Sequence, residues 1–284
     1  MILSSGLSSI GTLAGAGLGP FPLVLALSSL LAYAAAALPA ARQGAPARLA
    51  LGAPALVLGW VLHAALLVLD IGGWGVPGAG ARLGFGPVLS LTLWLVVAVH
   101  IVESRFVPLP SVRRALAVAG AIVVVLAFAF PGEVRGMSSP WAPLHWVLGV
   151  ASYGLFGAAV LHATLLDNAE RQLRRHAAPV TGPLGMPLLR LERLTFRFVE
   201  AGFVVLTFAL VLGFVSAHGW RFDHKTVFSL LGWAVFAALI VGRLLRGWRG
   251  RRATRWLYAG TVLLLLGYAG SRFVFEVVLG RPAS

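Results

Sequence analysis

The sequence predicts an all-α integral membrane protein, a single helical domain of eight transmembrane helices over residues 1–284. Of its residues, 59% are hydrophobic and 11% are charged, whereas a soluble domain carries about 25% charged residues. Apolar stretches of helical length recur between Phe21 and Leu279. Strands of a membrane barrel would be about ten residues long with alternating polarity, so these stretches predict helices. The absence of cysteine excludes a disulfide scaffold and a thiolate-ligated metal site.

Each expected span has about the length that crosses the hydrocarbon layer, which is about 20 apolar residues. Helix breakers separate the two closest pairs of spans: Gln43, Gly44 and Pro46 precede the second span. Pro108 and Pro110 precede the fourth. The eight expected spans are 20–41, 47–69, 85–106, 113–131, 142–166, 196–218, 226–245 and 254–279.

The distribution of basic residues orients the spans, because lysine and arginine gather in cytoplasmic loops. With both termini placed outside, 17 of the 23 basic residues fall in inner loops. We therefore expect eight helices with both termini extracytoplasmic. The net charge of +14 lies in short loops between spans, so it does not indicate nucleic-acid binding. The six outer basic residues are Arg82, Arg135, Arg221, Lys225, Arg272 and Arg281.

The longest connection, residues 167–195, is expected on the cytoplasmic side. Its polar start is expected to extend the fifth helix into solvent, and prolines and glycines from Pro179 to Pro187 then break it. Leucines and arginines alternate from Leu188 to Phe196, which predicts a short helix at the membrane surface. The segment is either an ordinary basic loop or a docking site for a membrane or cytoplasmic protein partner.

Histidines are the remaining candidates for chemistry, since no phosphate-binding loop, dinucleotide fingerprint, zinc-protease motif or catalytic triad is apparent. We therefore expect no enzyme activity. Four of the seven histidines lie inside spans. At 1.5 Å per residue, His63 lies about 10 Å and His145 about 6 Å below the outer edge, so the two can share a site. His100 and His162 approach the inner face, where we expect them to hydrate.

Small residues follow His145 on one helix face, at Gly149, Ser152 and Ala159, which favours an interior position for that histidine. Tryptophans and basic residues share the outer layer. They are consistent with an ordinary interfacial belt. Neutral imidazoles, flat aromatic walls and outer cations also suit haem, whose iron takes imidazole ligands and whose propionates pair with cations. The cation candidates are Arg221, Lys225 and Arg272.

Two segments carry a resemblance to the cytochrome c assembly (CcsA/CcmC-like) membrane protein superfamily. PLHWVLGVASYGLFGAAVLHATLL (143–166) resembles its His-then-Ser-Tyr helix. LERLTFRFVEAGFVVLTFALVLGFVSAHGW (191–220) resembles the helix that leads into its external haem-handling loop. The likeness covers roughly residues 55–275 and is greatest to the YpjD/HemX-like branch, found in bacterial inner membranes. It implies a helical bundle that presents haem to the outer side, with His145 as the first flanking histidine.

The sequence departs from the family pattern in and after that loop, which here reads HGWRFDHKTVF. Phe222 and His224 stand where the family has tryptophan and proline. The second external histidine is missing near Arg272, so His218 and His224 are reserve ligands. The histidine that often follows the loop is replaced in the region of Arg243.

These observations predict a membrane protein that binds or handles haem, haem b if it is bound, with His63 and His145 as axial ligands and no other metal site. A non-enzymatic scaffold or regulatory subunit of the tetrapyrrole pathway (HemX-like) that has lost haem is the alternative. It would recruit a partner through residues 167–195. A transport permease is the third hypothesis.

Overall fold

A computed structural model of the chain describes residues 20–38, 51–71, 81–82, 84–105, 109–130, 134–135, 141–174, 188–216, 224–270 and 273. These residues form eight α-helices, one π-helix and two short strands, which group into two compact units. Six of the helices are long and apolar enough to cross a membrane. The chain is thus a helical polytopic membrane protein, while the expected eight spans and the outer position of both termini stay predictions.

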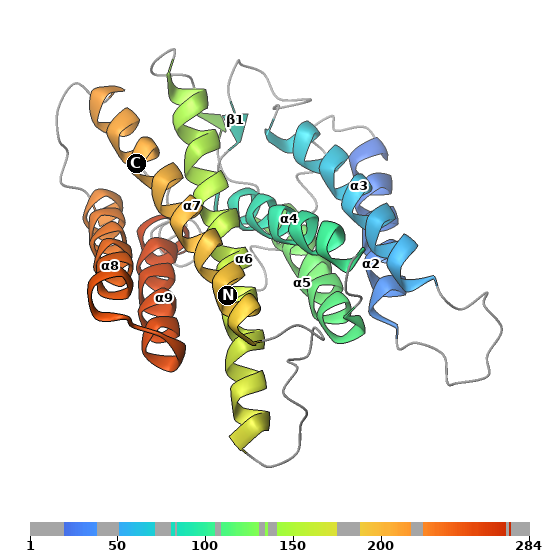
Figure 1. Cartoon of the computed structure of the whole chain (residues 1–284). Coiled ribbons are helices and arrows are strands. Elements are labelled where there is room, and N and C mark those ends of the chain that lie inside the picture. The colour runs from blue at the N-terminus through green and yellow to red at the C-terminus, as the bar shows by residue number, and fades with distance from the viewer. Residues whose placement is uncertain are drawn as a thin grey trace, which may run out of the picture. The chain divides into compact units, whose positions relative to one another are not determined.

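Unit 1 contains α2 (Pro20–Ala37), α3 (Gly52–Ile71), α4 (Phe85–Ser104) and α5 (Pro110–Ala129). Within it, α2 packs beside α3 and α5, and α4 packs beside α5 (Figure 1). Pro110 begins α5, at a position where a missing backbone N–H breaks no helical hydrogen bond. This packing brings α2, α3 and α5 around one buried tyrosine, Tyr33.

Two strands of two residues each, β1 (Ala81–Arg82) and β2 (Val134–Arg135), pair antiparallel in unit 1. The all-helical expectation missed this pair, because a two-residue ladder has no hydrophobic period that a sequence reveals. Both strands belong to loops that were expected on the outer side. Their pairing joins a segment that follows α3 to a segment that follows α5.

Unit 2 contains α6 (Ala142–Arg174), α7 (Leu188–Ser216), α8 (His224–Arg246) and α9 (Gly250–Leu265), which continues into the π-helix η2 (Leu266–Gly270). Within it, α6 packs on α7 and α9, and α8 packs on α9 (Figure 1). Phe156 and Phe236 stack in its core with ring centroids 3.9 Å apart. Gly260 makes room for this stack, since a Cβ there would lie 2.8 Å from Phe236 Cζ.

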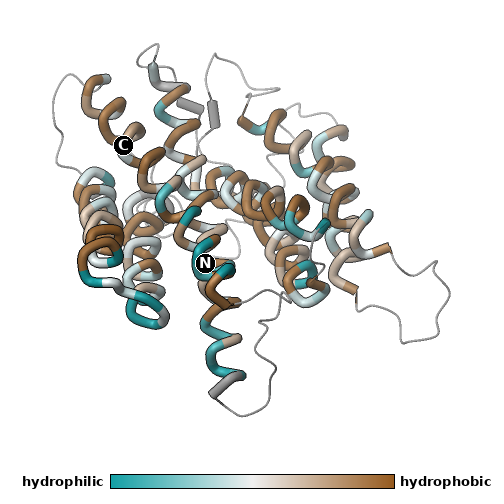
Figure 2. The backbone as a smooth tube through the Cα atoms, viewed as in Figure 1, coloured by the Kyte–Doolittle hydropathy of each residue, from teal (hydrophilic) through white to brown (hydrophobic). Residues whose placement is uncertain are grey.

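The connection expected at 167–195 is partly helical. α6 continues to Arg174, and α7 begins at Leu188, so the short surface helix expected from Leu188 to Phe196 is the first part of a 29-residue helix. Its leucine–arginine alternation joins the apolar span without a break, and Leu191 and Phe196 are buried in the core. Figure 2 shows hydrophobic residues along the helices and hydrophilic residues at the end of α6 and in the α8–α9 turn.

Large apolar side chains are exposed on both units, as expected where lipid replaces water as the solvent. Leu31 of α2, Val68 of α3 and Val215 of α7 are 71%, 72% and 66% exposed. A water-soluble protein avoids extended apolar surfaces of this kind. By contrast, the polar side chains of His63, His162 and Asp167 are buried.

Candidate functional site

His145 lies in the second turn of α6 in unit 2 and is half-buried. Its Nδ1 is 2.9 Å from the carbonyl oxygen of Ala209 in α7. A carbonyl oxygen only accepts hydrogen bonds, so Nδ1 carries the ring proton and Nε2 keeps its lone pair. Among the described residues, Nε2 has no hydrogen-bond partner.

Gly213 makes the approach of His145 to α7 possible. A Cβ on Gly213 would lie 2.8 Å from His145 Cε1, closer than carbon atoms tolerate. Gly213 stands four residues after Ala209, so in an α-helix its N–H bonds the same carbonyl oxygen that His145 uses. Any side chain at this position would therefore meet the imidazole ring.

The small-residue face below His145 is packed at one end and open at the other. Ser152 and Ala159 are fully buried, and Ser152 Oγ donates a hydrogen bond of 2.7 Å to the carbonyl of Gly149. No described atom lies within 4 Å of the position that a Cβ on Gly149 would take. The face thus leaves free space one helical turn from the imidazole.

This arrangement fits a haem ligand. Histidines that bind metals through Nε2 usually donate Nδ1–H to a carbonyl or carboxylate, which fixes the tautomer and the ring orientation. His145 has that partner, its Nε2 has no hydrogen-bond partner among the described residues, and open space lies one helical turn away at Gly149. Haem iron takes a neutral imidazole of this kind as its axial ligand.

His63 lies in unit 1 and has a different environment. It is 1% exposed, with Nδ1 3.0 Å from the Tyr33 hydroxyl and Nε2 2.6 Å from Ser90 Oγ. Both ring nitrogens are therefore engaged in hydrogen bonds. The Tyr33 ring stands edge-on to the imidazole and packs against Gly59 and Gly120, where no side chain interferes. To bind iron through Nε2, His63 would first have to release Ser90.

His63 and His145 belong to different compact units, so their predicted pairing stays a prediction. Of the other predicted site residues, Lys225 is half-buried in the first turn of α8, and His224 begins that helix. The remaining three, His218, Arg221 and Arg272, lie outside the described residues.

The two inner histidines are buried, which corrects the expectation that they hydrate. His100 is 4% exposed and His162 is 1% exposed. His162 donates from Nδ1 to the carbonyl of Ala158, 2.7 Å away in its own helix, and its ring contacts Phe198. Helix packing covers both side chains even though charged residues follow them in the sequence.

Asp167 was expected in a solvated extension, but it is only 8% exposed. Its two oxygens accept hydrogen bonds from Thr254 Oγ1 at 3.0 Å and from Tyr258 OH at 2.9 Å, both in α9. Thr254 and Tyr258 are four residues apart, so both hydroxyls lie on one helix face. The four-residue spacing of the two hydroxyl residues is the signal of this site in the sequence. The sequence does not reveal, however, which carboxylate lies against that helix face.

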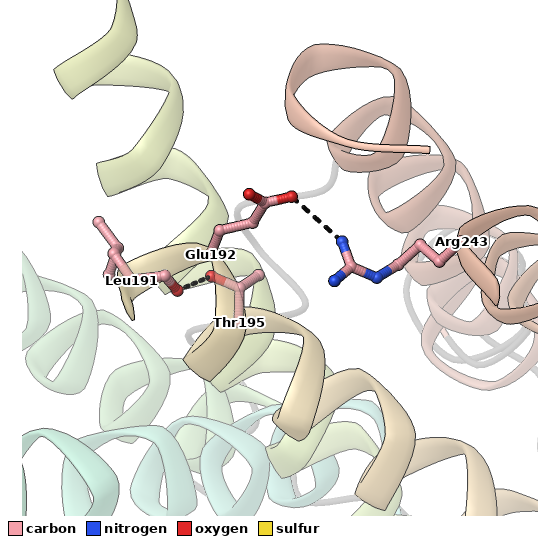
Figure 3. A network of polar contacts seen from close by, with 4 residues as sticks. All are labelled: Leu191, Glu192, Thr195 and Arg243. Atoms are coloured by element: carbon pink, nitrogen blue, oxygen red, sulfur yellow. Dashed lines mark hydrogen bonds and ion pairs between the residues drawn. The ribbon is translucent and has the colours of Figure 1, made fainter. Parts of the chain in front are cut away.

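Arg243 carries an ion pair where the family often has a histidine. Its Nη1 lies 3.2 Å from Glu192 Oε1, and its guanidinium carbon is 3.5 Å from the centroid of the Phe196 ring. Figure 3 shows Glu192 and Arg243 pointing toward each other from α7 and α8, with the Thr195 hydroxyl bonded to the Leu191 carbonyl nearby. This pair joins the start of α7 to the end of α8.

Comparison with known proteins finds a matching family model and relatives whose names agree with it. A family model described as "Cytochrome C assembly protein" matches residues 85–279. The chain is 30% identical to the inner membrane protein YpjD of Escherichia coli (strain K12) over 201 residues, 69% of this chain and 75% of YpjD. It is 25% identical to the cytochrome c biogenesis protein CcsA of Prochlorococcus marinus over 222 residues, 66% of this chain and 70% of CcsA. No solved structure matches the chain.

Proposed function

The chain belongs to the cytochrome c assembly protein family, and from this premise we propose that it binds haem through His145. It is a multi-pass bacterial inner-membrane protein that is surrounded by the lipid bilayer. The observation that supports the proposal is the tautomer of His145 that the Ala209 carbonyl fixes, which leaves the Nε2 lone pair without a hydrogen-bond partner among the described residues. We propose haem b as the bound form, held without covalent attachment, and no enzyme activity.

His63 is the second proposed axial ligand, as the sequence predicted. Tyr33 and Ser90 already occupy both of its ring nitrogens, so ligation requires that one of these hydrogen bonds be released. His63 therefore has a second role to be separated from ligation, namely holding α2, α3 and α4 together. His218, His224, Arg221, Lys225 and Arg272 remain proposed contacts of the haem iron or its propionates.

The test is haem titration of the purified full-length protein, followed by its Soret absorption. His145→Ala should weaken haem binding at least about tenfold and shift the Soret band, because a ligand is lost. Added imidazole should restore the spectrum by replacing the missing side chain. Gly213→Ala should weaken binding in the same direction, since the new methyl group displaces the ring.

The same titration on His63→Ala separates its two roles. Loss of haem with rescue by imidazole would identify a ligand, whereas loss of folding without rescue would identify a structural residue. An unchanged spectrum in His145→Ala would contradict the proposal. If the wild-type protein binds no haem at all, the scaffold alternative, with a protein partner on residues 167–195, is favoured over this proposal.

A further inference from the structure

We propose that the α8–α9 turn, residues 247–252, binds the phosphate group of an anionic membrane phospholipid. This site is separate from His145 and does not depend on haem. The turn begins after the last residue of α8, Arg246, and ends in the first turn of α9. Four features of the turn, given below, favour this ligand.

The first feature is uncompensated positive charge. Five arginines in and around the turn are exposed, and none of them forms an ion pair with another described residue. Among the described residues, two carboxylates of α6 approach α9. Asp167 is bonded to Thr254 and Tyr258, and Glu170 lies beside Gly250. The excess of cations attracts an anion to this end of unit 2. The five arginines are Arg246, Arg249, Arg251, Arg252 and Arg255.

The second feature is the start of α9. The N-cap residue, Arg249, makes no side-chain hydrogen bond to the helix, and the first turn contains no acidic residue. The first backbone N–H groups of a helix lack intrahelical partners and carry a partial positive charge. Phosphate groups commonly bind to such helix starts.

The third feature is independent of the helix. The indole Nε1 of Trp248 is buried and has no hydrogen-bond acceptor among the described residues, although the residue is only 9% exposed. Its Cε3 edge packs against Gly242, and Nε1 lies on the opposite edge of the ring. The guanidinium carbon of Arg252 is 4.3 Å from the centroid of this ring. Buried indole N–H groups usually have an acceptor. Nε1 is covered in this structure, so a phosphate oxygen bound by Arg252 would reach it only once the exposed Arg252 side chain moves from its place over the ring.

The fourth feature distinguishes a lipid from a soluble anion. Leu244 and Leu245, which directly precede the turn, are 77% and 79% exposed. They provide an apolar surface for an acyl chain next to the cations that would hold the headgroup. Exposed leucines beside arginines are typical of a contact with the membrane interface. A free phosphate ion would gain nothing from these leucines.

The experiment counts phospholipids that stay bound to the full-length protein in native mass spectrometry, with phosphatidylglycerol and phosphatidylcholine as probes. We expect the wild-type protein to retain phosphatidylglycerol in preference to phosphatidylcholine. Arg251→Gln combined with Arg252→Gln should weaken that binding at least about tenfold, since one basic residue near anionic lipid contributes about fivefold. Trp248→Phe, which keeps an aromatic ring but removes the indole N–H together with the pyrrole ring, should also lower retention.

The matched control is Arg190→Gln combined with Arg193→Gln, which removes the same charge from exposed positions at the start of α7. The Glu192–Arg243 pair places that start beside the end of α8, so the control reports general electrostatic attraction. Equal losses in the two double variants would overturn the site, and so would equal retention of both phospholipids by the wild type. Displacement by inorganic phosphate as effectively as by phosphatidylglycerol would show a free-anion site instead of a lipid site. Unchanged retention in Trp248→Phe would remove Nε1 from the proposed ligands.

Discussion

Replacing Ser90 with alanine tests whether His63 is part of the structural core of unit 1. Ser90 Oγ lies 2.6 Å from His63 Nε2, and both residues are 1% exposed. A buried polar group left without a partner costs about 1–3 kcal/mol, and polar contacts between membrane helices average about 0.6 kcal/mol with a maximum of about 1.7. The short distance and the complete burial place Ser90→Ala near the upper end of the membrane range, at about 1.5 kcal/mol.

The measurement is the free energy of unfolding of the full-length protein in mixed micelles, titrated with dodecyl sulfate and followed by circular dichroism. Ser104→Ala is the matched control in the same helix, because Ser104 Oγ bonds only its own helix, at Ile101 O. This control should change stability by less than about 0.5 kcal/mol. Tyr33→Phe should match Ser90→Ala, since it removes the partner of the other ring nitrogen. Equal stability of Ser90→Ala and Ser104→Ala would refute the reasoning.

Two further predictions concern α6 and the topology. Asp167→Ala should lower the free energy of unfolding by about 2 kcal/mol, because it leaves the Tyr258 hydroxyl without its acceptor and the Thr254 hydroxyl with only a longer bond of 3.4 Å to the Arg251 carbonyl. Glu200→Ala, which removes only an exposed 3.9 Å ion pair, should cost less than about 0.5 kcal/mol in the same titration, and similar losses would contradict the first expectation. Reporter fusions test the orientation, and an external reporter after Gly250 would overturn it. We expect cytoplasmic reporters after Ala178 and Gly250 and external reporters near Gly78, Gly136 and Asp223.

The helices were predictable because the hydropathy of a membrane span is a strong local signal. The expected span 85–106 corresponds to Phe85–Ser104, and the expected span 226–245 corresponds to His224–Arg246. The ends were harder to place where polar residues continue a helix. α6 continues to Arg174, as the expected helical extension predicted, but the start of that extension is not solvated, since Leu166 and Ala169 pack in the core beside Asp167.

The site was only partly predictable. The sequence placed His145 on a face of small residues, and Ser152 and Ala159 on that face are indeed buried. The sequence did not reveal that Tyr33 and Ser90 bond both ring nitrogens of His63, because such contacts depend on which helices become neighbours. Hydrogen bonds between residues far apart in the sequence have no local period, so only the fold could show them.

The contact between His145 and Gly213 has a consequence for sequence variation. The imidazole of residue 145 bonds a backbone carbonyl, and residue 213 must lack a side chain for the ring to reach that carbonyl. The two positions, on different helices, therefore constrain each other. A chain with a larger residue at position 213 has no room for histidine at position 145 in this rotamer. We therefore expect substitutions at the two positions to occur together.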